Sequence, residues 1–392
     1  MPSFNDPGKI IITCSKRLSQ YLQAEIVELG FKVERVFSTG VELHGSLNDC
    51  IRLNLNLCCA SQILYSLDSF KCNNPDQLYK SVLEIPWEKI LMQNGYFSVT
   101  SFVDDPTINN SLFANVKVKD AIVDRFRNKV SVRPDTGPQL QHAVIHLFWR
   151  SGVAEIFIDT SGETLSKHGY RKIPGQAPML ESLAAATLLA AKWDRKSTFI
   201  NPMCGSSTIA IEAAMMATNR KPGLFRNNYS FMHINGYDEN FYTEEKKRLN
   251  NQIVNEPNVK IIASDISGDA INISKINANA AGVGDLIHFM VCDFQETEIP
   301  DKDKGVIFLN PEYGERMGNK LELEETYKTI GDFLKQKCGG YMAYIFTGNL
   351  ELAKKVGLRS SRKIEFYNSK IDCRLLEYEL YAGSRRTDKD IQ

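Results

Sequence analysis

The chain has 392 residues with 47 basic and 47 acidic side chains, so its formal net charge at pH 7 is zero. At about 100–200 residues per domain this length predicts two or three domains, and the ordinary hydrophobic and charged content excludes a disordered or fibrous protein. The neutral balance argues against a protein that coats nucleic acid by bulk charge, so any such binding must come from a local patch.

Neither a membrane span nor a leader sequence is expected. No apolar run approaches the roughly 18–20 residues that a spanning helix needs. Residues 1–8 lack the cationic start and the apolar core of a signal peptide. We therefore expect a cytoplasmic protein that does not associate with membranes.

The cysteines and histidines show no metal-binding spacing. The nine cysteines include no C-x2-C pair, which fits reduced thiols. His142 and His146 lie four residues apart, but no glutamate completes an H-E-x-x-H motif, and the surrounding residues favour a strand on which both rings share one face. We predict a protein without a metal site.

Residues 1–74 have the pattern of a small α+β unit. A short apolar run at 9–14 predicts a buried strand, and the apolar stripe of 18–29 predicts a helix. Residues 31–45 alternate as one or two strands, and a second helix is expected from about 47 to 64. This order of elements predicts a ferredoxin-like domain.

Residues 75–160 form a second predicted domain, with a strand at 96–102, a basic helix at 111–129 and a strand pair after it. The helix and the residues that follow it carry six cations with only two acids between them. Such a run is either a solvated helix face or a patch that contacts RNA phosphates, and the charge pattern alone leaves both interpretations open. The cations are Lys117, Lys119, Arg125, Arg127, Lys129 and Arg133.

The third predicted domain, 161–383, alternates helices and short apolar runs after a long apolar helix at 177–193. Five such runs indicate a parallel sheet covered by helices on both faces and closed by an antiparallel hairpin. The runs lie at 198–200, 259–263, 287–291, 306–309 and 341–346, and the hairpin strands at 364–367 and 375–381. The polar residues 384–392 are expected to be a disordered tail.

Ligands of such sheets bind beyond the carboxyl ends of the strands, so the loops there form the candidate site. The first loop, at 201–208, opens a helix with small residues and presents free backbone N–H groups to an anion. It lacks the lysine of a P-loop and the third glycine of a dinucleotide motif, which favours the carboxylate of S-adenosylmethionine over a pyrophosphate. We expect Gly205, Ser206 and Ser207 at the methionine end of that cofactor. The alternative is a turn that only lets the helix pack on its strand.

Two acids follow the next two runs. Asp265 ends the second run and can accept the hydroxyls of a ribose, and Asp293 follows the third, where an adenine amino group can be bound. Residues 220–257, between Gly205 and Asp265, are therefore an insertion. Two acids without a basic phosphate clamp suit a cationic sulfonium better than NADP or a nucleoside triphosphate. For each acid, a helix N-cap or a loop turn is the alternative.

The fourth run ends in the sequence Asn310-Pro-Glu-Tyr313. The Asn310 side chain and the Pro311 backbone carbonyl can together accept both hydrogens of a planar amino group, and Tyr313 can stack on the ring that carries it. An exocyclic amine is a poor nucleophile, so orientation and stabilisation of its developing charge are what the protein must supply. The alternative is an ordinary Asx-Pro turn.

Six groups of residues, in the same order, resemble the THUMP-containing class I RNA methyltransferases over about residues 45–382. The resemblance is closest to the bacterial 23S rRNA guanine-N2 methyltransferases in their form without a fused second methyltransferase. The matching residues are 159–171, 177–186, 201–208 with 211–216, 222–226, 264–266 and 310–316. The resemblance implies an α/β, Rossmann-like class I methyltransferase with a mostly parallel seven-stranded sheet, preceded by an α+β ferredoxin-like/THUMP region.

The resemblance also implies S-adenosyl-L-methionine as cofactor, ribosomal RNA as partner and guanine N2 of 23S rRNA as the methylated group. The catalytic residues would be Asn310, Pro311 and Tyr313. The cofactor would be held by Pro178, Leu180, Asn201, Cys204, Gly205, Ser206, Ser207, Asp265, Ile266, Asp293 and Phe294. Residues 75–160 would bind RNA as a THUMP module, with Arg171 and Arg316 joining the six cations of that region on the phosphates.

Three residues depart from the usual family pattern. Asn201 stands for an aspartate, Ser207 for a glycine in a position that favours positive φ, and Glu312 for a second proline. We expect Glu312 to point away from the amine and activity to persist. Two alternatives remain: methylation of adenine N6 in DNA, since the same loop orients any planar amine, and a non-catalytic RNA-binding or ribosome-assembly factor that kept the fold.

Overall fold

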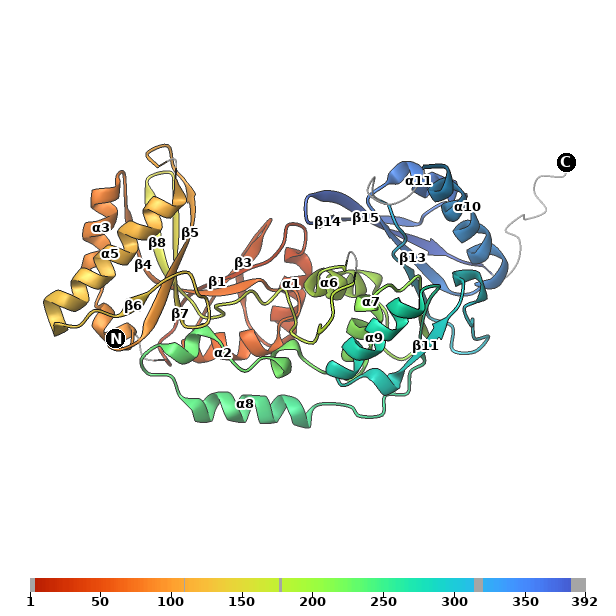
Figure 1. The fold of residues 1–392 in the computed structure, drawn as a ribbon, viewed down its shortest axis with the longest axis horizontal. Helices are drawn as coiled ribbons and strands as arrows, with labels where there is room; N and C mark the ends of the chain where they lie inside the picture. Colours follow the sequence, from red (N-terminus) through yellow and green to blue (C-terminus); the bar gives the residue numbers. More distant parts are fainter. Residues whose placement is uncertain (1–3, 109, 176–177, 314–319, 382–392) are drawn as a thin grey trace. The chain divides into compact units, whose positions relative to one another are not determined.

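The computed structural model describes residues 4–108, 110–175, 178–313 and 320–381, so the tail predicted at 384–392 lies outside the described residues. The chain divides into two compact units, each built around its own sheet (Figure 1). Unit 1 comprises Met1–Ser15, Leu22–Lys167 and Lys221–Asn251, and unit 2 comprises Lys16–Tyr21, His168–Arg220 and Gln252–Gln392.

Unit 1 contains an eight-stranded sheet with the order β2-β3-β1-β4-β8-β7-β5-β6. Only β5 pairs in parallel with its neighbours, β6 and β7, and the other pairs are antiparallel. The strands are β1 (Gly8–Thr13), β2 (Val33–Phe37), β3 (Gly40–Gly45), β4 (Gln62–Lys71), β5 (Tyr96–Asp104), β6 (Asp135–Thr136), β7 (Ala143–Arg150) and β8 (Val153–Asp159). Because β4 pairs with β8, the two predicted N-terminal domains share one continuous sheet, and the boundary at 74/75 stays a proposal.

Helices of unit 1 pack either on this sheet, as α2 and α5 do, or on neighbouring helices. The apolar residues Ala114, Val118 and Ile122 of α5 are buried, and this helix packs on β5 and lies beside α3 (Figure 1). The helical segments are α1 (Ser19–Glu28), α2 (Leu47–Asn56), α3 (Pro75–Glu84), α4 (Trp87–Ile90), α5 (Ser111–Val130), the 3-10 turns η1 (Pro222–Phe225) and η2 (Ser230–His233), and α8 (Glu239–Asn251).

The helix predicted from about 47 to 64 is shorter than expected. It ends at Asn56, and β4 begins at Gln62, so the sequence analysis missed this strand. Leu64 and Tyr65 of β4 are buried because the strand pairs with β1 and β8, whose residues are distant in sequence. Pairing of this kind outweighs local helical periodicity.

The insertion predicted at 220–257 packs largely with unit 1 rather than with the methyltransferase-like part of the chain. The backbone N–H of Val144 on β7 donates to Ser230 Oγ at 2.9 Å, and Arg226 Nη2 donates to the carbonyl of Ser161 at 3.0 Å. Tyr229 and Phe231 are buried. The domain proposed at 161–383 therefore includes residues 221–251, which group with unit 1 in the structure.

Unit 2 contains a seven-stranded sheet with the order β11-β10-β9-β12-β13-β15-β14. The first five are parallel, and β14 and β15 form the antiparallel hairpin at the edge, which confirms the predicted mostly parallel sheet. The strands are β9 (Phe199–Pro202), β10 (Ile261–Asp265), β11 (Ile287–Val291), β12 (Val306–Leu309), β13 (Met342–Thr347), β14 (Arg362–Asn368) and β15 (Ile371–Glu379).

Helices cover both faces of this sheet. On one face, Ile200, Ile307 and Ile345 of the strands form a core cluster with residues of α10 and α11. On the other, Tyr344 Oη donates to the carbonyl of Ala191 in α6 at 2.9 Å. The helical segments are α6 (Glu181–Ala191), α7 (Thr208–Ala217), α9 (Gly268–Ala280), η3 (Gly284–Leu286), η4 (Phe294–Glu296), α10 (Lys320–Lys337) and α11 (Leu350–Lys355).

The strand order reverses between β9 and β12, because the chain runs outward from β9 to β11 and then returns to β12. In a doubly wound sheet this switch point is where a ligand binds. Among the helices of the described residues, none combines the length and the apolar character that a membrane span requires.

Candidate functional site

A cavity of about 680 Å³ lies at the carboxyl ends of β9, β10 and β12 in unit 2. This volume falls in the range of small-molecule and cofactor sites. The predicted residues that line it are Pro178, Asn201, Cys204, Gly205, Ser206, Asp265, Ile266, Asp293, Phe294, Asn310 and Pro311. The structure therefore brings together most of the residues that the loop motifs indicated.

The loop after β9 combines left-handed backbone conformations with a hydrogen bond to a carboxylate. Met203, Gly205 and Ser207 all have φ near +55°, a conformation in which only glycine is free of strain. The backbone N–H of Gly205 donates to Asp265 Oδ2 at 2.9 Å. The N–H of Ser206 has no hydrogen-bond partner among the described residues, so it is free to meet an anion at the start of α7.

Asp265 stabilises the loop and still faces the cavity. Its Oδ2 accepts from Gly205, and its Oδ1 accepts from the backbone N–H of Ser267 at 3.0 Å. A carboxylate has about four acceptor positions, so two hydrogen bonds leave capacity for the hydroxyls of a ligand. Asp265 can therefore stabilise the turn and bind a ligand at the same time.

Asp293, Ile266 and Phe294 form the far wall of the cavity. Asp293 is the N-cap of η4, with its Oδ1 accepting from Gln295 N at 2.9 Å. Ile266 is 73% exposed and offers apolar surface that a flat ring could cover. The Phe294 ring packs edge-on against Phe333. This wall combines an acid with apolar surface.

Two buried amide oxygens that belong to lining residues lack a partner. Asn201 Nδ2 donates to the Phe308 carbonyl at 2.8 Å, but its Oδ1 is buried and has no hydrogen-bond partner among the described residues. The same is true of Asn310 Oδ1. A buried acceptor left unpaired costs about 1–3 kcal/mol, so each is a ready acceptor for a donor group of a ligand. These atoms, with the two acids, fit a ligand that carries N–H and O–H groups beside a positive charge.

Tyr313 and Glu312 do not lie as predicted. Tyr313 is not among the lining residues: its ring packs edge-on against Phe346, and its Oη accepts from Asn368 Nδ2 at 2.9 Å. Burial raises the pKa of this phenol well above its ordinary value. Glu312, expected to point away, is exposed and lines the cavity. Tyr313 has an apolar pocket and a hydrogen-bond partner on β14, which accounts for its turn away from the cavity.

Leu180 and Ser207 also lie off the cavity wall. Leu180 is the N-cap residue of α6. Ser207 is the N-cap residue of α7 and is fully buried in the left-handed conformation, without a side-chain capping bond. Both support neighbouring residues that do line the cavity.

Arg171, which was expected to contact RNA phosphates, instead makes hydrogen bonds and an ion pair within unit 2. Its Nη2 donates to the Met179 carbonyl at 2.7 Å and to Thr208 Oγ1 at 2.9 Å, and its Nη1 lies 3.5 Å from Glu181 Oε2. Met179 and Thr208 line the cavity. The guanidinium therefore ties the start of α7 to one cavity wall, a role that its position in a motif did not reveal.

A second buried pair anchors the same helix. His168 Nδ1 lies 2.7 Å from Glu212 Oε1, and both side chains are almost fully buried. Burial raises the pKa of Glu181 above its ordinary value, and the nearby Arg171 offsets only part of that. In the sequence, this network is indicated by acidic residues placed among alanines and leucines, because an unpaired charge in such a buried helix is costly.

The predicted basic patch in unit 1 is largely paired with acids. Arg125 makes a two-pronged contact with Glu88, through Nε–Oε2 and Nη2–Oε1 distances of 3.0 Å. The other pairs are Lys117–Asp76 at 3.5 Å, Lys119–Asp120 at 3.3 Å and Arg127–Asp124 at 3.3 Å. Lys129 and Arg133 are exposed and have no ion pair within the described ranges. Arg316 lies outside the described residues.

Several residues that line the cavity were not predicted. Some, such as Met203 and Thr208, lie in the examined loop after β9 but were not singled out, and others come from helix faces that strand-end motifs do not include. The signal was their spacing: Ala270 and Ile273 on α9, and Leu323 and Thr326 on α10, each lie three residues apart on one helix face. The full set is Gly175, Met179, Met203, Thr208, Ile209, Ser267, Asp269, Ala270, Ile273, Leu323 and Thr326.

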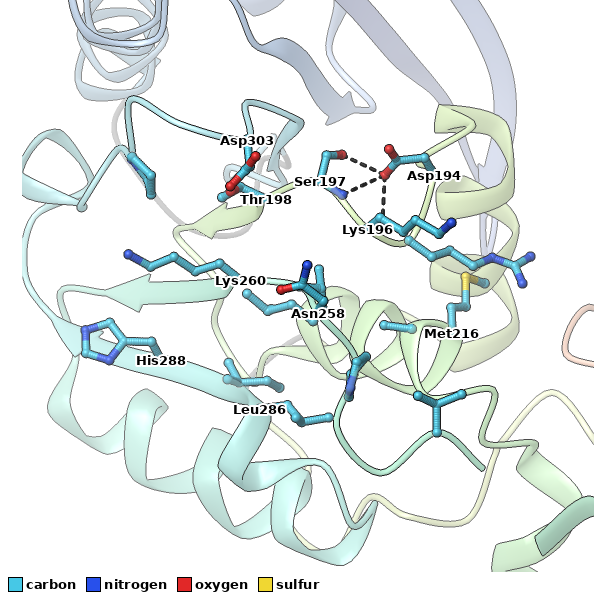
Figure 2. Close-up of a pocket in the computed structure, with 18 of the residues that line it drawn as sticks. Asp194, Lys196, Ser197, Thr198, Met216, Asn258, Lys260, Leu286, His288 and Asp303 are labelled. Atoms are coloured by element: carbon cyan, nitrogen blue, oxygen red, sulfur yellow. Dashed lines mark hydrogen bonds between the residues drawn. The ribbon is translucent and has the colours of Figure 1, made fainter. Parts of the chain in front are cut away.

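A larger cavity, about 1380 Å³, lies at the opposite, amino-terminal end of the same sheet, where Thr198, Lys260 and Leu286 precede β9, β10 and β11 (Figure 2). No predicted site residue lines it. Its lining includes Asp194, which accepts hydrogen bonds from Lys196 and Ser197 (Figure 2). In the described part of the chain, no group of three or more His, Cys, Asp or Glu side chains is arranged to hold a metal ion.

Residues 168–377 match the family model described as the RMKL-like methyltransferase domain. Residues 9–64 match the RlmL ferredoxin-like domain and 72–159 match the THUMP domain. These matches confirm the resemblance found in the motifs.

The curated relatives include proteins named ribosomal RNA large subunit methyltransferase K/L. That of Shewanella baltica is 33% identical over 374 residues, which cover 94% of this chain and 53% of the relative. That of Shewanella amazonensis is 34% identical over 371 residues, which cover 94% and 52%. The chain spans about half the length of the curated relatives it matches.

Solved structures share the whole fold. SMU.472, described as a candidate methyltransferase and crystallised with S-adenosylhomocysteine, superposes with a TM-score of 0.87 at 25% identity, covering 96% of this chain and 99% of that one. A protein of Listeria monocytogenes, described as a predicted N6-adenine-specific DNA methylase, gives 0.85 at 27% identity and covers 96% and 97%.

The family model covers more than half of the chain and includes every residue that lines the carboxyl-end cavity. This chain therefore belongs to the family of RMKL-like methyltransferase domains, with a ferredoxin-like domain and a THUMP domain before it.

Proposed function

We propose that the protein transfers a methyl group from S-adenosyl-L-methionine to an exocyclic amine of ribosomal RNA, and that the amine is N2 of a guanine in 23S rRNA. The observation that carries this proposal is Asn310 Oδ1, a buried and unpaired acceptor among the residues of a cavity whose wall also carries Asp265 and Asp293. The names of the curated relatives support ribosomal RNA as the substrate. We expect the protein in the cytoplasm, where that RNA is assembled.

The proposed cofactor fits the charges of the cavity. The free N–H of Ser206 would meet the methionine carboxylate, Asp265 the ribose hydroxyls and Asp293 the adenine amino group. Ile266 and Phe294 would cover the adenine ring. When bound, the cofactor supplies a methyl group on a positively charged sulfur, and the carboxylates of this wall favour that charge.

The chain's own contribution to the reaction is orientation of the amine. Asn310 Oδ1 and the Pro311 carbonyl would each accept one N–H of the amino group, which turns its lone pair toward the methyl donor. The same oxygens would stabilise the positive charge that develops on the nitrogen. Glu312, which lines the cavity, is the nearest acid to that charge in sequence and could accept the released proton. Tyr313 would hold the Asn310 loop against β14 rather than stack on the base.

Residues 75–160 would supply RNA binding. Among the predicted cations, Lys129 and Arg133 are exposed and have no acid partner within the described ranges, so they are the best candidates for phosphate contacts. Arg125 is held by Glu88 and is a poor one.

The test is methyl transfer by the purified full chain to protein-free 23S rRNA and to duplex DNA, with mass-spectrometric mapping of the product. We expect N2-methylguanine in the rRNA and no product in DNA. N6-methyladenine in DNA would favour the second candidate, which the description of the Listeria relative supports. Cofactor binding without transfer to either substrate would favour a non-catalytic factor.

A further inference from the structure

The sheet of unit 1 presents an aromatic face that the basic patch does not include. Phe102 on β5 stands opposite Phe148 on β7, which in turn stands opposite Glu155 on β8. One step along, Thr100 stands opposite His146, and His146 opposite Phe157. Because side chains alternate between the two faces of a sheet, these residues share one face. The helix α5 packs on β5 against the other face, where Ile145, Leu147 and Trp149 are buried.

Two phenylalanines of this face are stacked and open to solvent. The ring centroids of Phe102 and Phe148 are 5.3 Å apart with planes inclined by 13°, and the side chains are 51% and 37% exposed. The cluster continues inward through His146, whose ring lies 6.5 Å from that of Phe157. Single exposed apolar residues are ordinary, but two stacked rings on neighbouring strands form a contiguous apolar surface, on which a further ring can stack against an outer face.

Charged groups surround the ring pair. Arg150 and Asp104 form the next cross-strand pair beyond Phe148 and Phe102, with Nε and Oδ2 3.3 Å apart, and both are largely exposed. Lys71 at the end of β4 is exposed and has no ion pair among the described residues. Glu155 is neutralised by an ion pair with Lys9. The aromatic surface is thus bordered by two ion pairs and by one cation, Lys71, that has no ion pair among the described residues.

We propose that this face of β5 and β7 is a stacking surface for unpaired RNA bases, with Phe102 and Phe148 as the platform and the exposed, unpaired Lys71 as a phosphate contact. The proposal rests on the proposed RNA substrate and specifies which residues bind that RNA and through which contacts. Aromatic side chains on an open sheet stack on unpaired bases, and they do so with little sequence preference because every base has a π-face. A paired helix keeps its bases stacked on one another, so the platform selects single strands, loops and bulges.

The dimensions favour a base over a protein partner. A stable protein interface buries about 800 Å² on each partner, whereas an entire phenylalanine buries at most about 150–250 Å². Two half-exposed rings therefore offer far less apolar area than a protein interface, but enough for one or two bases. The hydrogen-bonded His146–Thr100 pair, at 2.8 Å, lies beside the rings and can meet a base edge.

The test uses the full chain without cofactor at raised salt, which suppresses phosphate contacts. The probes are an eight-nucleotide RNA with 2-aminopurine at its centre and the same RNA in a perfect duplex. The parent should bind the single strand more tightly and quench its fluorescence by stacking. The double variant F102L/F148L should bind it about tenfold more weakly with the quenching lost, whereas F102Y/F148Y should stay close to the parent.

The matched control is Phe113→Leu, since Phe113 is 46% exposed in the same unit but lies on α5. It should leave binding unchanged. Unaltered single-strand binding by F102L/F148L would overturn the proposal. Photo-crosslinking of the parent to 4-thiouridine RNA gives a second readout that needs no variant: adducts on β5 and β7 support the platform, and adducts only elsewhere overturn it. Neither readout depends on methyl transfer, so a wrong methylation product would refute the proposed function without touching this result.

Discussion

The sheet of unit 2 has a cavity at each end, and the two differ in how their polar atoms are used. At the amino-terminal end, Asp194 Oδ1 accepts from the backbone N–H groups of Lys196 and Ser197 (Figure 2). Lys304 Nζ donates to the Gly339 carbonyl at 2.8 Å. Lys260 pairs with Glu298 at 2.6 Å. At the carboxyl end, Asn201 Oδ1 and Asn310 Oδ1 are buried without a partner in the described structure.

Among the described residues, buried acceptors without a partner therefore occur in the lining of the smaller cavity and not in that of the larger one. Folding leaves a buried acceptor unpaired only at a cost, which a bound ligand can repay. Volume alone would have selected the wrong end of the sheet. Paired variants, one at each end of the sheet, test this difference.

The largest expected effect is that of Asn310→Ala. Removing the amide oxygen removes one of the two groups that orient the amine, so methyl transfer to 23S rRNA should fall about 10²–10³-fold. Cofactor affinity, measured by calorimetry, should stay close to that of the parent. The matched change at the other end is Asn258→Ala, which lines the amino-end cavity and should leave the rate unchanged. Equal rates for parent and N310A would contradict the contrast between the two ends.

The next effect concerns stability. Arg171→Met leaves Glu181 buried without its cation, which should lower the free energy of unfolding by about 3 kcal/mol in denaturant titration. Lys260→Met breaks the half-exposed pair with Glu298 at the amino end and should cost less than about 1 kcal/mol. A loss of similar size in the two variants would show that the Arg171 pair is not effectively buried.

A smaller effect is expected for Asp265→Asn. The amide oxygen can still accept from Gly205, but the amide nitrogen that replaces the second oxygen can accept neither from the Ser267 N–H nor from the ribose. Affinity should fall about tenfold, and equally for S-adenosylmethionine and S-adenosylhomocysteine, because both contain the ribose. Asp303→Asn, at the amino end, should change neither affinity. A loss confined to S-adenosylmethionine would assign Asp265 to the sulfonium charge instead.

Features built by buried strands and strand ends could be predicted from the sequence. The run at 306–309 is fully buried because β12 is central in a sheet covered on both faces, and such strands appear as continuous apolar runs. Asp265 and Asn310 follow directly from those runs, so their presence at one end of the sheet was predictable. These inferences needed only local pattern and the geometry of parallel strands.

What failed depended on partners distant in sequence. The acids that pair with Lys117 and Arg125 come from α3 and α4, so charge counting within α5 overstated its free charge. Tyr313 turned toward Asn368 on the closing hairpin, a neighbour that no motif revealed. In both cases the side chain found a partner inside the protein, which local sequence cannot show.

Ser207 gives a smaller prediction with a definite sign. It is a non-glycine residue at φ +55°, so Ser207→Gly should raise the free energy of unfolding by about 1 kcal/mol through relief of strain. Gly205→Ala should lower it by a similar amount: an added Cβ would contact nothing within 4 Å, so only the positive φ opposes it. Both are measured without cofactor. A loss of stability in S207G would mean that packing of the buried side chain outweighs the strain.

The smallest effect is a pair of opposite pH dependences. Burial raises the pKa of Glu181 above 4.5, so its contribution to stability is greatest below that pH and declines as pH rises through the folded pKa. For Asp194, burial alone would raise the pKa, but hydrogen bonds from Ser197 and Lys196 outweigh it and lower the pKa below 3.8. Its contribution is present above 3.8 and is lost as pH falls. In an NMR titration, the carboxyl chemical shift of Glu181 should therefore change at a higher pH than that of an ordinary glutamate. The shift of Asp194 should change at a lower pH than that of an ordinary aspartate. If both carboxyl groups had ordinary pKa values, this difference between Glu181 and Asp194 would be contradicted.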